Sequence, residues 1–460
     1  MTRISSSSTS RPSDKAVSGD GKQSSFLFSF SIWNTMMGVS LLSMPWGLYQ
    51  AGFAFGLFIL LLMCLLCLYT SYLVVKSPES LEKSDAVDVE FAKICQIYFG
   101  KPGAITALVF SIMILVGAIL AYWVLMSNFI YFSGKLLYEI VHPLNTTETD
   151  EEGKCSIHCR INNTFGSHTS VFSDSPLIFG LSFNDIWQLR LTVPIYLAIL
   201  VFPLLNFKSP TFFTKFNILG TISVIYLLIF NGSRLIECGV NLNFSDLTSP
   251  NYVHNFSWNF PALTGMLTMS YFLHNAIITM LRNQRNPENN VRDLSIGYGL
   301  VAFSYTFVAF SFYAAFPLPR TCIGDNLLNN FHANNPMSAV ARVLIFFQLL
   351  TILPLIMYFI RSQISCALFG TPWPGRVRVL ILNSTIVCAG VLTAIFFPNI
   401  GSIIRYFGAL SGLMYAYALP CMVDMRIAHR AGKLTPVKII ICVTIMVFGA
   451  ANLVAQFFIK

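Results

Sequence analysis

Charged side chains are scarce in this sequence. Only 11% of its 460 residues are Asp, Glu, Lys or Arg, whereas roughly 25% of the residues of a soluble domain are charged. Hydrophobic residues make up 55%, and they occur in runs of about twenty, long enough to cross a bilayer core of about 30 Å. Because a water-soluble protein needs no such runs, we expect an all-α polytopic membrane protein.

Sequence motifs for catalysis are also missing. The chain has no Gly-rich phosphate loop, no metal-type spacing of His and Cys, and no nucleophile elbow. The cytosolic loops predicted below are too short to hold an ATP-hydrolysing domain. These absences argue against an enzyme, and they leave a carrier driven by an ion gradient or by facilitated diffusion, or a channel.

Carboxylates are absent from the interior of the predicted spans. Many proton-coupled carriers depend on such groups, so that mechanism loses support. His274 is the internal group that could titrate, although a lone His in a membrane helix is about as often a structural hydrogen-bonding group. The net charge of +9 does not indicate nucleic-acid binding, because the basic residues lie in short loops between spans.

Hydropathy predicts about eleven spans. Their approximate limits are 26–50, 52–76, 103–133, 189–205, 212–234, 260–281, 296–318, 337–360, 377–397, 400–422 and 437–459. Residues 1–25 form a Ser-rich segment that we expect to be a disordered cytosolic tail without a cleavable signal peptide. Residues 26–460 then form one transmembrane domain.

The Lys and Arg bias of the loops predicts a cytosolic N-terminus and a C-terminus on the opposite side of the membrane. The long loop at about 134–188 then faces the lumen or the exterior. Four glycosylation sequons fall in two loops on that side, at Asn145, Asn162, Asn243 and Asn255.

Most of the eleven cysteines lie inside spans, where Cys behaves as a small apolar residue. Four fall in the exterior loops, where the environment is oxidising: Cys155, Cys159, Cys238 and Cys322. One bridge is expected from the long loop to Cys322, with Cys155 or Cys159 as the other end. Free thiols are the alternative.

Two predicted spans carry helix-weakening residues near their middle. The first has Gly38 and Pro45, with polar groups nearby, and the sixth has Gly265 within 260–265, followed by the polar stretch 270–275. A broken helix in lipid is tolerated where its free carbonyl and amide groups line a cavity. Breaks in the first and sixth spans are the pattern of a five-plus-five inverted repeat, although Gly and Pro are also common in membrane helices in general.

Thr351, in the eighth span, is a candidate cation ligand. Its hydroxyl oxygen could hold a sodium ion together with Asn34 and carbonyls of the first span, since a hard cation prefers neutral or anionic oxygen ligands. The alternative is that the hydroxyl bonds to a carbonyl of its own helix, which is common for Thr.

Several long motifs resemble those of the amino acid/auxin permease superfamily. They are WNTMMG at 33–38, SMPWG at 43–47, QAGF at 50–53, YWVLMSNF at 122–129, LNFKSP at 205–210, KFNILG at 215–220, NNVRDL at 289–294 and FPNIG at 397–401. The resemblance covers the chain from about residue 26 to the C-terminus. It implies a five-plus-five inverted repeat with one extra helix and a role as a secondary amino-acid transporter.

The resemblance also implies the site residues. An amino acid is expected at the break in the first span, around Thr35, Met36, Gly38, Val39 and Ser40, and the weaker candidates His274 and Asn275 lie where the sixth span closes the pocket. Asn34 and Thr351 are implied as ligands of a sodium ion. Members of the family have Thr where Val39 stands here, a difference that could alter selectivity.

Substrate and location remain open at this stage. The lack of an intramembrane carboxylate favours a neutral amino acid such as leucine or glutamine, while the resemblance favours arginine and a lysosomal or late endosomal membrane rather than the plasma membrane. A sensor that binds an amino acid without appreciable flux is the alternative function. The related lysosomal protein engages a nutrient-signalling scaffold through a long cytosolic tail, and we do not expect that partner from a segment of about 25 residues.

Overall fold

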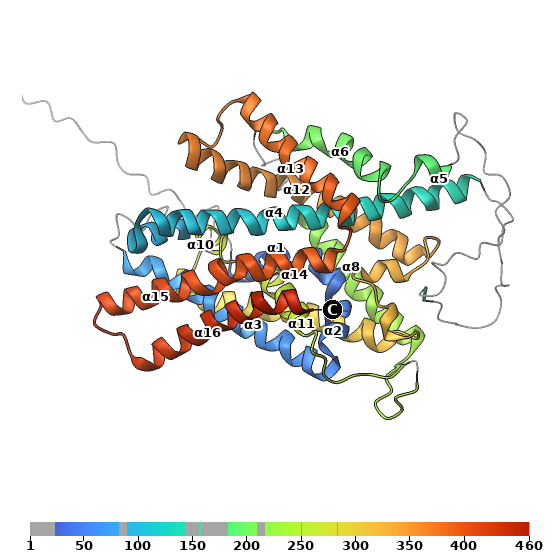
Figure 1. Ribbon diagram of the computed structural model, residues 1–460, viewed down its shortest axis with the longest axis horizontal. Coiled ribbons are helices and arrows are strands. Elements are labelled where there is room, and N and C mark those ends of the chain that lie inside the picture. Colours follow the sequence, from blue (N-terminus) through green and yellow to red (C-terminus); the bar gives the residue numbers. More distant parts are fainter. Residues whose placement is uncertain are drawn as a thin grey trace, which may run out of the picture.

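The computed structural model describes residues 24–81, 90–142, 156–157, 183–208, 217–249, 251–282 and 284–459. Almost all of these residues are helical, and the long helices lie roughly parallel or antiparallel to one another (Figure 1). An all-α membrane architecture with a broken first and a broken sixth span is therefore confirmed. The predicted tail at 1–25 lies almost entirely outside the described residues.

The first repeat holds the spans that the sequence places first to fifth. They are α1 (Ser25–Met36) with α2 (Ser40–Ala51), α3 (Phe53–Lys76), α4 (Phe91–Val141), α6 (Thr192–Leu205) and α8 (Asn217–Cys238), with the short 3-10 turn η1 (Ser77–Ser80) after α3 and the single-turn helix α5 (Phe183–Ile186) before α6. The first span is thus two helices, and α6 is the shortest unbroken one.

The second repeat has the same plan. It consists of α9 (Pro261–Ser270) with α10 (Ile277–Leu281), α11 (Asn290–Ala315), α12 (Pro336–Phe369), α13 (Arg376–Phe396), and a continuous run of α14 (Ile400–Ser411), the π-helix η6 (Gly412–Ala418) and α15 (Leu419–Arg430). The short turns η3 (Pro287–Asn289), η4 (Arg320–Cys322) and η5 (Leu327–Asn330) lie in its loops. The extra helix α16 (Pro436–Ala455) and the turn η7 (Gln456–Phe458) follow.

The predicted number of spans depends on how broken and short helices are counted. Eight of the described helices are long and apolar enough to cross a membrane, and the bent pair α1–α2 makes nine. Adding the 14-residue α6 and the pair α9–α10 gives eleven. The third helix is much longer than predicted, because α4 runs through a bend at Gly100 (φ 69°) and continues to Val141.

The break in the first span lies at Gly38, as expected. The N–H group of Met37 makes the last bond of α1, to the carbonyl of Trp33, and Met37 is then extended, with ψ of 106°. The axes of α1 and α2 differ by 65°. Pro45 was expected to interrupt the span as well, but α2 continues through it.

The break in the sixth span lies further along the chain than the sequence suggested. The helix α9 ends at Ser270, and α10 begins at Ile277. Gly265, the expected breaking residue, lies inside α9, where a Cβ atom would come within 2.8 Å of the carbonyl of Arg405. The glycine is therefore needed for the close approach of α14, whose Gly408 faces the carbonyl of Gly265 in the same way.

Buried polar contacts hold α1 against α11. The Oγ atom of Ser29 donates to the carbonyl of Asp293 at 3.0 Å, and the indole Nε1 of Trp33 donates to Ser304 Oγ at 2.9 Å. Asp293 belongs to the first turn of α11, which begins before the predicted span, so a buried carboxylate does occur inside a helix, near its end. The two contacts attach α1 to α11 along the turns that precede the break.

Candidate functional site

The five residues predicted at the first break lie on both sides of it. Met36, Val39 and Ser40 are buried, and Gly38 is partly exposed. Thr35 is exposed, and its hydroxyl donates to the carbonyl of Ser31 on its own helix at 2.7 Å. The structure thus brings backbone groups, rather than polar side chains, of this motif to the break.

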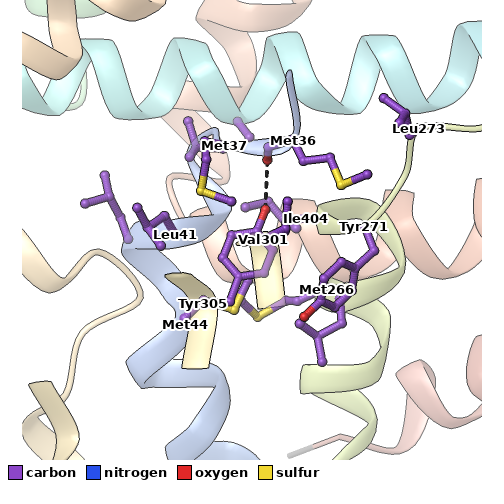
Figure 2. Close-up of a cluster of buried hydrophobic side chains, with 14 of the residues drawn as sticks. Met36, Met37, Leu41, Met44, Met266, Tyr271, Leu273, Val301, Tyr305 and Ile404 are labelled. Carbon is purple, nitrogen blue, oxygen red and sulfur yellow. Dashed lines mark hydrogen bonds between the residues drawn. The ribbon is translucent and has the colours of Figure 1, made fainter. Parts of the chain in front are cut away.

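Tyr305, on α11, connects the two breaks. Its hydroxyl donates to the carbonyl of Met36 at 2.8 Å (Figure 2). It also lies 3.2 Å from the carbonyl of Ser270. These carbonyls belong to the last residues of α1 and α9, and the C-terminal end of a helix carries partial negative charge. A hydrogen-bond donor or a cation is therefore favoured at this point, and the buried hydroxyl of Tyr305 supplies the donor.

The N-terminal end of α2 offers the opposite charge. No hydrogen bond among the described residues uses the N–H groups of Gly38, Val39 or Ser40, and α2 has no side-chain cap. The hydroxyl of Tyr122, on α4, lies beside them, 3.2 Å from the position that a Cβ atom on Gly38 would take. Free N–H groups at a helix N-terminus bind anions such as carboxylates.

The two breaks together match the two ends of an α-amino acid. The carbonyls of Met36 and Ser270 are the acceptors that an ammonium group requires, and the N–H groups of α2 are the donors that a carboxylate requires. Sequence analysis missed Tyr122 and Tyr305. Tyr122 lies in the motif at 122–129 that supports the family resemblance, and that motif could have pointed to it. Nothing near Tyr305 in the sequence points to the first break.

Methionine is prominent in the apolar cluster around the breaks. Met36, Met37, Met44 and Met266 pack there with other buried side chains, and Figure 2 draws no charged side chain among the residues it labels. Methionine is unbranched and adapts its shape to what it contacts. Such a cluster suits an uncharged substrate side chain of variable size.

The proposed sodium ligands lie where α1, α8 and α12 meet. Asn34 Oδ1 accepts a long hydrogen bond from the Thr221 hydroxyl, at 3.4 Å. A Cβ atom on Gly220 would be 3.0 Å from Asn34 Oδ1 and 3.1 Å from Gln348 Nε2, so these two side chains converge on the glycine. Thr351 lies one turn beyond Gln348 on α12.

Asn34 Oδ1 and the hydroxyl oxygens of Thr221 and Thr351 are uncharged oxygen atoms on the three helices of this junction, whereas the atom of Gln348 nearest Gly220 is the donor Nε2. The Thr351 hydroxyl donates to the carbonyl of Gln348 at 2.8 Å, the local bond that was the alternative to a ligand role. Because that bond uses the proton, the lone pairs of the Thr351 oxygen stay available to a cation. No cluster of three His, Cys, Asp or Glu residues suited to a metal occurs in the described part of the chain, and a sodium ion held by amide, hydroxyl and carbonyl oxygens needs none.

His274 and Asn275 lie in the non-helical segment between α9 and α10. His274 is 1% exposed, and its Nε2 atom is 2.8 Å from Thr70 Oγ1 and 3.3 Å from Ser71 Oγ, both on α3. Ser71 is in turn hydrogen-bonded to Tyr298, which donates to the carbonyl of Tyr271. This side of the imidazole therefore anchors the second break to α3 and α11, while Asn275 is partly exposed.

The predicted modification sites are only partly within the described residues. Cys238 and Cys322 are each disulfide-bonded. Cys155 and Cys159 lie outside the described residues, so the pairing stays a prediction, and a bridge at Cys238 was not foreseen. Asn145 and Asn162 also lie outside them, whereas Asn255 is exposed and Asn243 accepts the N–H groups of Ser245 and Asp246 in a local turn.

Known proteins of one family match this chain over nearly its whole length. Residues 21–459 match the family described as transmembrane amino acid transporter protein. A Caenorhabditis elegans protein named sodium-coupled neutral amino acid transporter 9 homolog is 49% identical, over 97% of this chain and 75% of its own length. Proteins named neutral amino acid transporter 9 are 43% identical in Xenopus tropicalis, over 96% of this chain and 81% of theirs, and 42% identical in Rattus norvegicus, over 96% and 80%.

A solved structure shares the fold. The crystal structure of MhsT in complex with L-phenylalanine superposes with a TM-score of 0.55 over 94% of this chain and 97% of that one, at 11% identity. That protein has the fold of the five-plus-five inverted-repeat transporters, so the predicted fold class is confirmed. On the family match and on relatives that are aligned along nearly the whole chain, the protein belongs to the transmembrane amino acid transporter family.

Proposed function

We propose that this chain is a secondary active transporter that carries amino acids by alternating access and is linked to sodium. Its substrates are arginine, neutral amino acids such as leucine and glutamine, or both, and its location is the lysosomal or late endosomal membrane. Amino-acid transport follows from the family; the coupling ion, the substrate range and the location are the proposed part.

The single observation that carries the proposal is the junction at Tyr305. One hydroxyl group lies within hydrogen-bonding distance of the carbonyls that end α1 and α9, at 2.8 and 3.2 Å. The first and the sixth spans are therefore broken at the same place in space. The free N–H groups of α2 lie at the other side of the first break. In transporters with inverted repeats, such half-helix ends bind the charged groups of the substrate.

The substrate side chain is assigned from the surrounding residues. The cluster around the break is apolar and rich in methionine, which favours neutral amino acids, and the relatives' names contain the word neutral. Carbonyl oxygens can also accept hydrogen bonds from a guanidinium group, so arginine is retained. Sodium is supported by the oxygen atoms of Asn34, Thr351 and Gln348 and by the name of the Caenorhabditis elegans relative.

Transport in a defined membrane tests the proposal. The purified chain is reconstituted in liposomes, and uptake of radiolabelled arginine, leucine and glutamine is measured with and without an inward sodium gradient, with protein-free liposomes as the control. Saturable uptake that the gradient accelerates is the expected result. Saturable binding of an amino acid without uptake of any would instead identify a sensor, and uptake that is indifferent to sodium would remove the ion from the proposal.

A further inference from the structure

The helix α16 stands outside the two repeats, and it buries a single narrow stripe. Its buried residues are Cys442, Ile445, Gly449 and Asn452, and Gln456 follows in η7. The last two are polar, at 5% and 0% exposure. A buried amide in a membrane protein costs free energy unless it is hydrogen-bonded, so the partners of these two side chains show what the helix is fixed to.

Each amide is bonded to α9, the first half of the broken sixth span, through one of its two polar atoms, whereas Asn452 Nδ2 and Gln456 Oε1 have no partner among the described residues. The hydroxyl of Thr264 donates to Asn452 Oδ1 at 2.7 Å and also lies 3.1 Å from the carbonyl of Pro261 on its own helix. Gln456 Nε2 donates to the carbonyl of Pro261 at 2.7 Å and lies 3.0 Å from Asn452 Oδ1. The end of α16 is therefore tied to α9 at its first residue and one turn further on.

The same face of α9 is held by the π-helix η6. Thr268, one turn beyond Thr264, is hydrogen-bonded to the Tyr417 hydroxyl at 2.7 Å. Gly449 of α16 lies under the Tyr417 ring, where a Cβ atom would come within 2.8 Å of it. The helix α16 thus contacts α9 directly and supports the tyrosine that contacts α9 next.

The bonded positions are close to the substrate site along a rigid helix. Ser270 follows Thr264 by six positions, about 9 Å at 1.5 Å per residue. The carbonyl of Ser270 is one of the two that face the Tyr305 hydroxyl. Whatever sets the position of α9 also sets the position of that carbonyl.

We propose that Asn452 and Gln456 are positioning residues for transport: through Thr264 and Pro261 they fix α9, and with it the Ser270 carbonyl that receives the substrate ammonium group. The inference rests on the proposed function, because it takes the helix ends at Tyr305 as the substrate site. It gives the extra helix a role in substrate affinity in addition to its contact with lipid.

Thr264 allows an exchange of one hydroxyl for one methyl group. Thr264→Val removes the donor to Asn452 at nearly constant volume, and Thr264→Ser keeps it. Thr393→Val on α13 is the matched control, because the bond that the Thr393 hydroxyl makes within the described part of the chain is to the carbonyl of Ala389 on its own helix. Uptake kinetics in proteoliposomes are measured for these variants, for Asn452→Ala and for the double variant Thr264→Val with Asn452→Ala.

Hydrogen bonds between membrane helices have a modest free energy, so a rise in the substrate KM of about threefold is expected for Thr264→Val and Asn452→Ala, with the maximal rate per transporter unchanged. Thr264→Ser and Thr393→Val should keep the wild-type KM. The double variant should resemble Asn452→Ala, because that substitution already removes the contact with the Thr264 hydroxyl. If Thr264→Val prevents insertion, Gln456→Met tests the link to Pro261 and should raise the KM similarly.

Three results would overturn the inference: a wild-type KM in Thr264→Val and Asn452→Ala, equal effects of Val and Ser at position 264, or additive effects in the double variant. If wild-type uptake is saturable and any of these results is found, the positioning role is wrong, while the proposed transport function stands. A wild-type protein without saturable uptake removes both.

Discussion

The hydroxyl group of Tyr305 donates to the backbone carbonyl of Met36 across the break in the first span. The carbonyl of Ser270, at the end of α9, lies within reach of the same hydroxyl. A phenol hydroxyl has one proton and can donate a full hydrogen bond to only one of these carbonyls. An ammonium group has three protons and also carries the positive charge that both helix ends favour. If the substrate ammonium group binds these carbonyls as proposed, it competes with the Tyr305 hydroxyl, which is the weaker donor.

Tyr305→Phe should lower the substrate KM. The substrate no longer has to displace a hydrogen bond with a net free energy of about 1 kcal/mol, which corresponds to a decrease in KM of about fivefold. Uptake kinetics in proteoliposomes measure it. Tyr226→Phe is the matched control, since the Tyr226 hydroxyl also donates to a carbonyl, that of Met337, away from the breaks. A higher KM in Tyr305→Phe would show that the hydroxyl binds the substrate instead of competing with it.

Local sequence predicted the break at Gly38 but could not predict what lies over it. A glycine that follows polar residues within an apolar span marks a weak point in the helix. Neighbouring residues in the sequence are enough to give that signal. Tyr305 is 269 positions from Met36, and its contact depends on how α11 packs against α1. Such a contact follows from the tertiary fold alone.

Gly265 shows the limit of the same reasoning. A glycine in a membrane span either weakens the helix or admits a neighbouring helix at short distance, and the sequence does not distinguish the two. In the structure, Gly265 admits α14, and the break falls after Ser270. The sequence leaves two interpretations each for Thr351 and His274. A hydroxyl or an imidazole in a span can bond equally well within its own helix or to a distant part of the chain.

Thr351→Val should weaken the response to sodium more than the binding of the amino acid. The variant keeps the volume of the side chain and removes the oxygen that we assign to the cation. The sodium concentration that gives half-maximal uptake should rise several-fold, while the substrate KM at saturating sodium stays within about twofold. Thr351→Ser, which keeps the oxygen, is the control. Equal sodium dependence in Val and Ser variants would remove Thr351 from the ion site.

Asp325, in the loop between α11 and α12, should make the stability of the protein depend on pH. Its carboxylate accepts the N–H groups of Ile400 at 2.6 Å and Gly401 at 3.3 Å, at the start of α14. Burial nevertheless raises the pKa of this carboxyl group above its usual value. The folded protein therefore binds the proton more tightly than the unfolded chain, so this contribution to stability is present at acidic pH and is lost as the pH rises through the raised pKa.

Thermal unfolding measured between pH 4 and pH 7.5 checks the direction of this pH dependence. The quantity to compare is the midpoint temperature of the wild type minus that of Asp325→Asn. The amide resembles the protonated acid, so the difference should decrease toward neutral pH. Asp246→Asn is the control, because hydrogen bonds from Thr248 lower the pKa of the Asp246 carboxyl, so its contribution is nearly complete at the acidic end of this range and its difference should stay nearly constant toward neutral pH. A difference that grows toward neutral pH at position 325 would contradict the assignment.

The last prediction concerns Gly38 and Tyr122 as a pair. A Cβ atom on Gly38 would have the Tyr122 hydroxyl oxygen, at 3.2 Å, as its nearest neighbour outside the adjoining chain. Gly38→Ala should therefore crowd that oxygen and lower the free energy of unfolding by about 1 kcal/mol. Tyr122→Phe removes the oxygen, so the double variant should regain most of the lost stability.

Transport should not recover with stability, because the same hydroxyl is assigned to the substrate carboxylate. In Tyr122→Phe and in the double variant we expect the KM for leucine to rise about tenfold, the effect of losing a hydrogen bond to a charged group. The affinity for leucinamide, which has no carboxylate, should change little, and competition against radiolabelled leucine measures it. If stability and leucine KM recover together in the double variant, Tyr122 acts on Gly38 by packing alone, and the carboxylate is bound by the N–H groups of α2 without it.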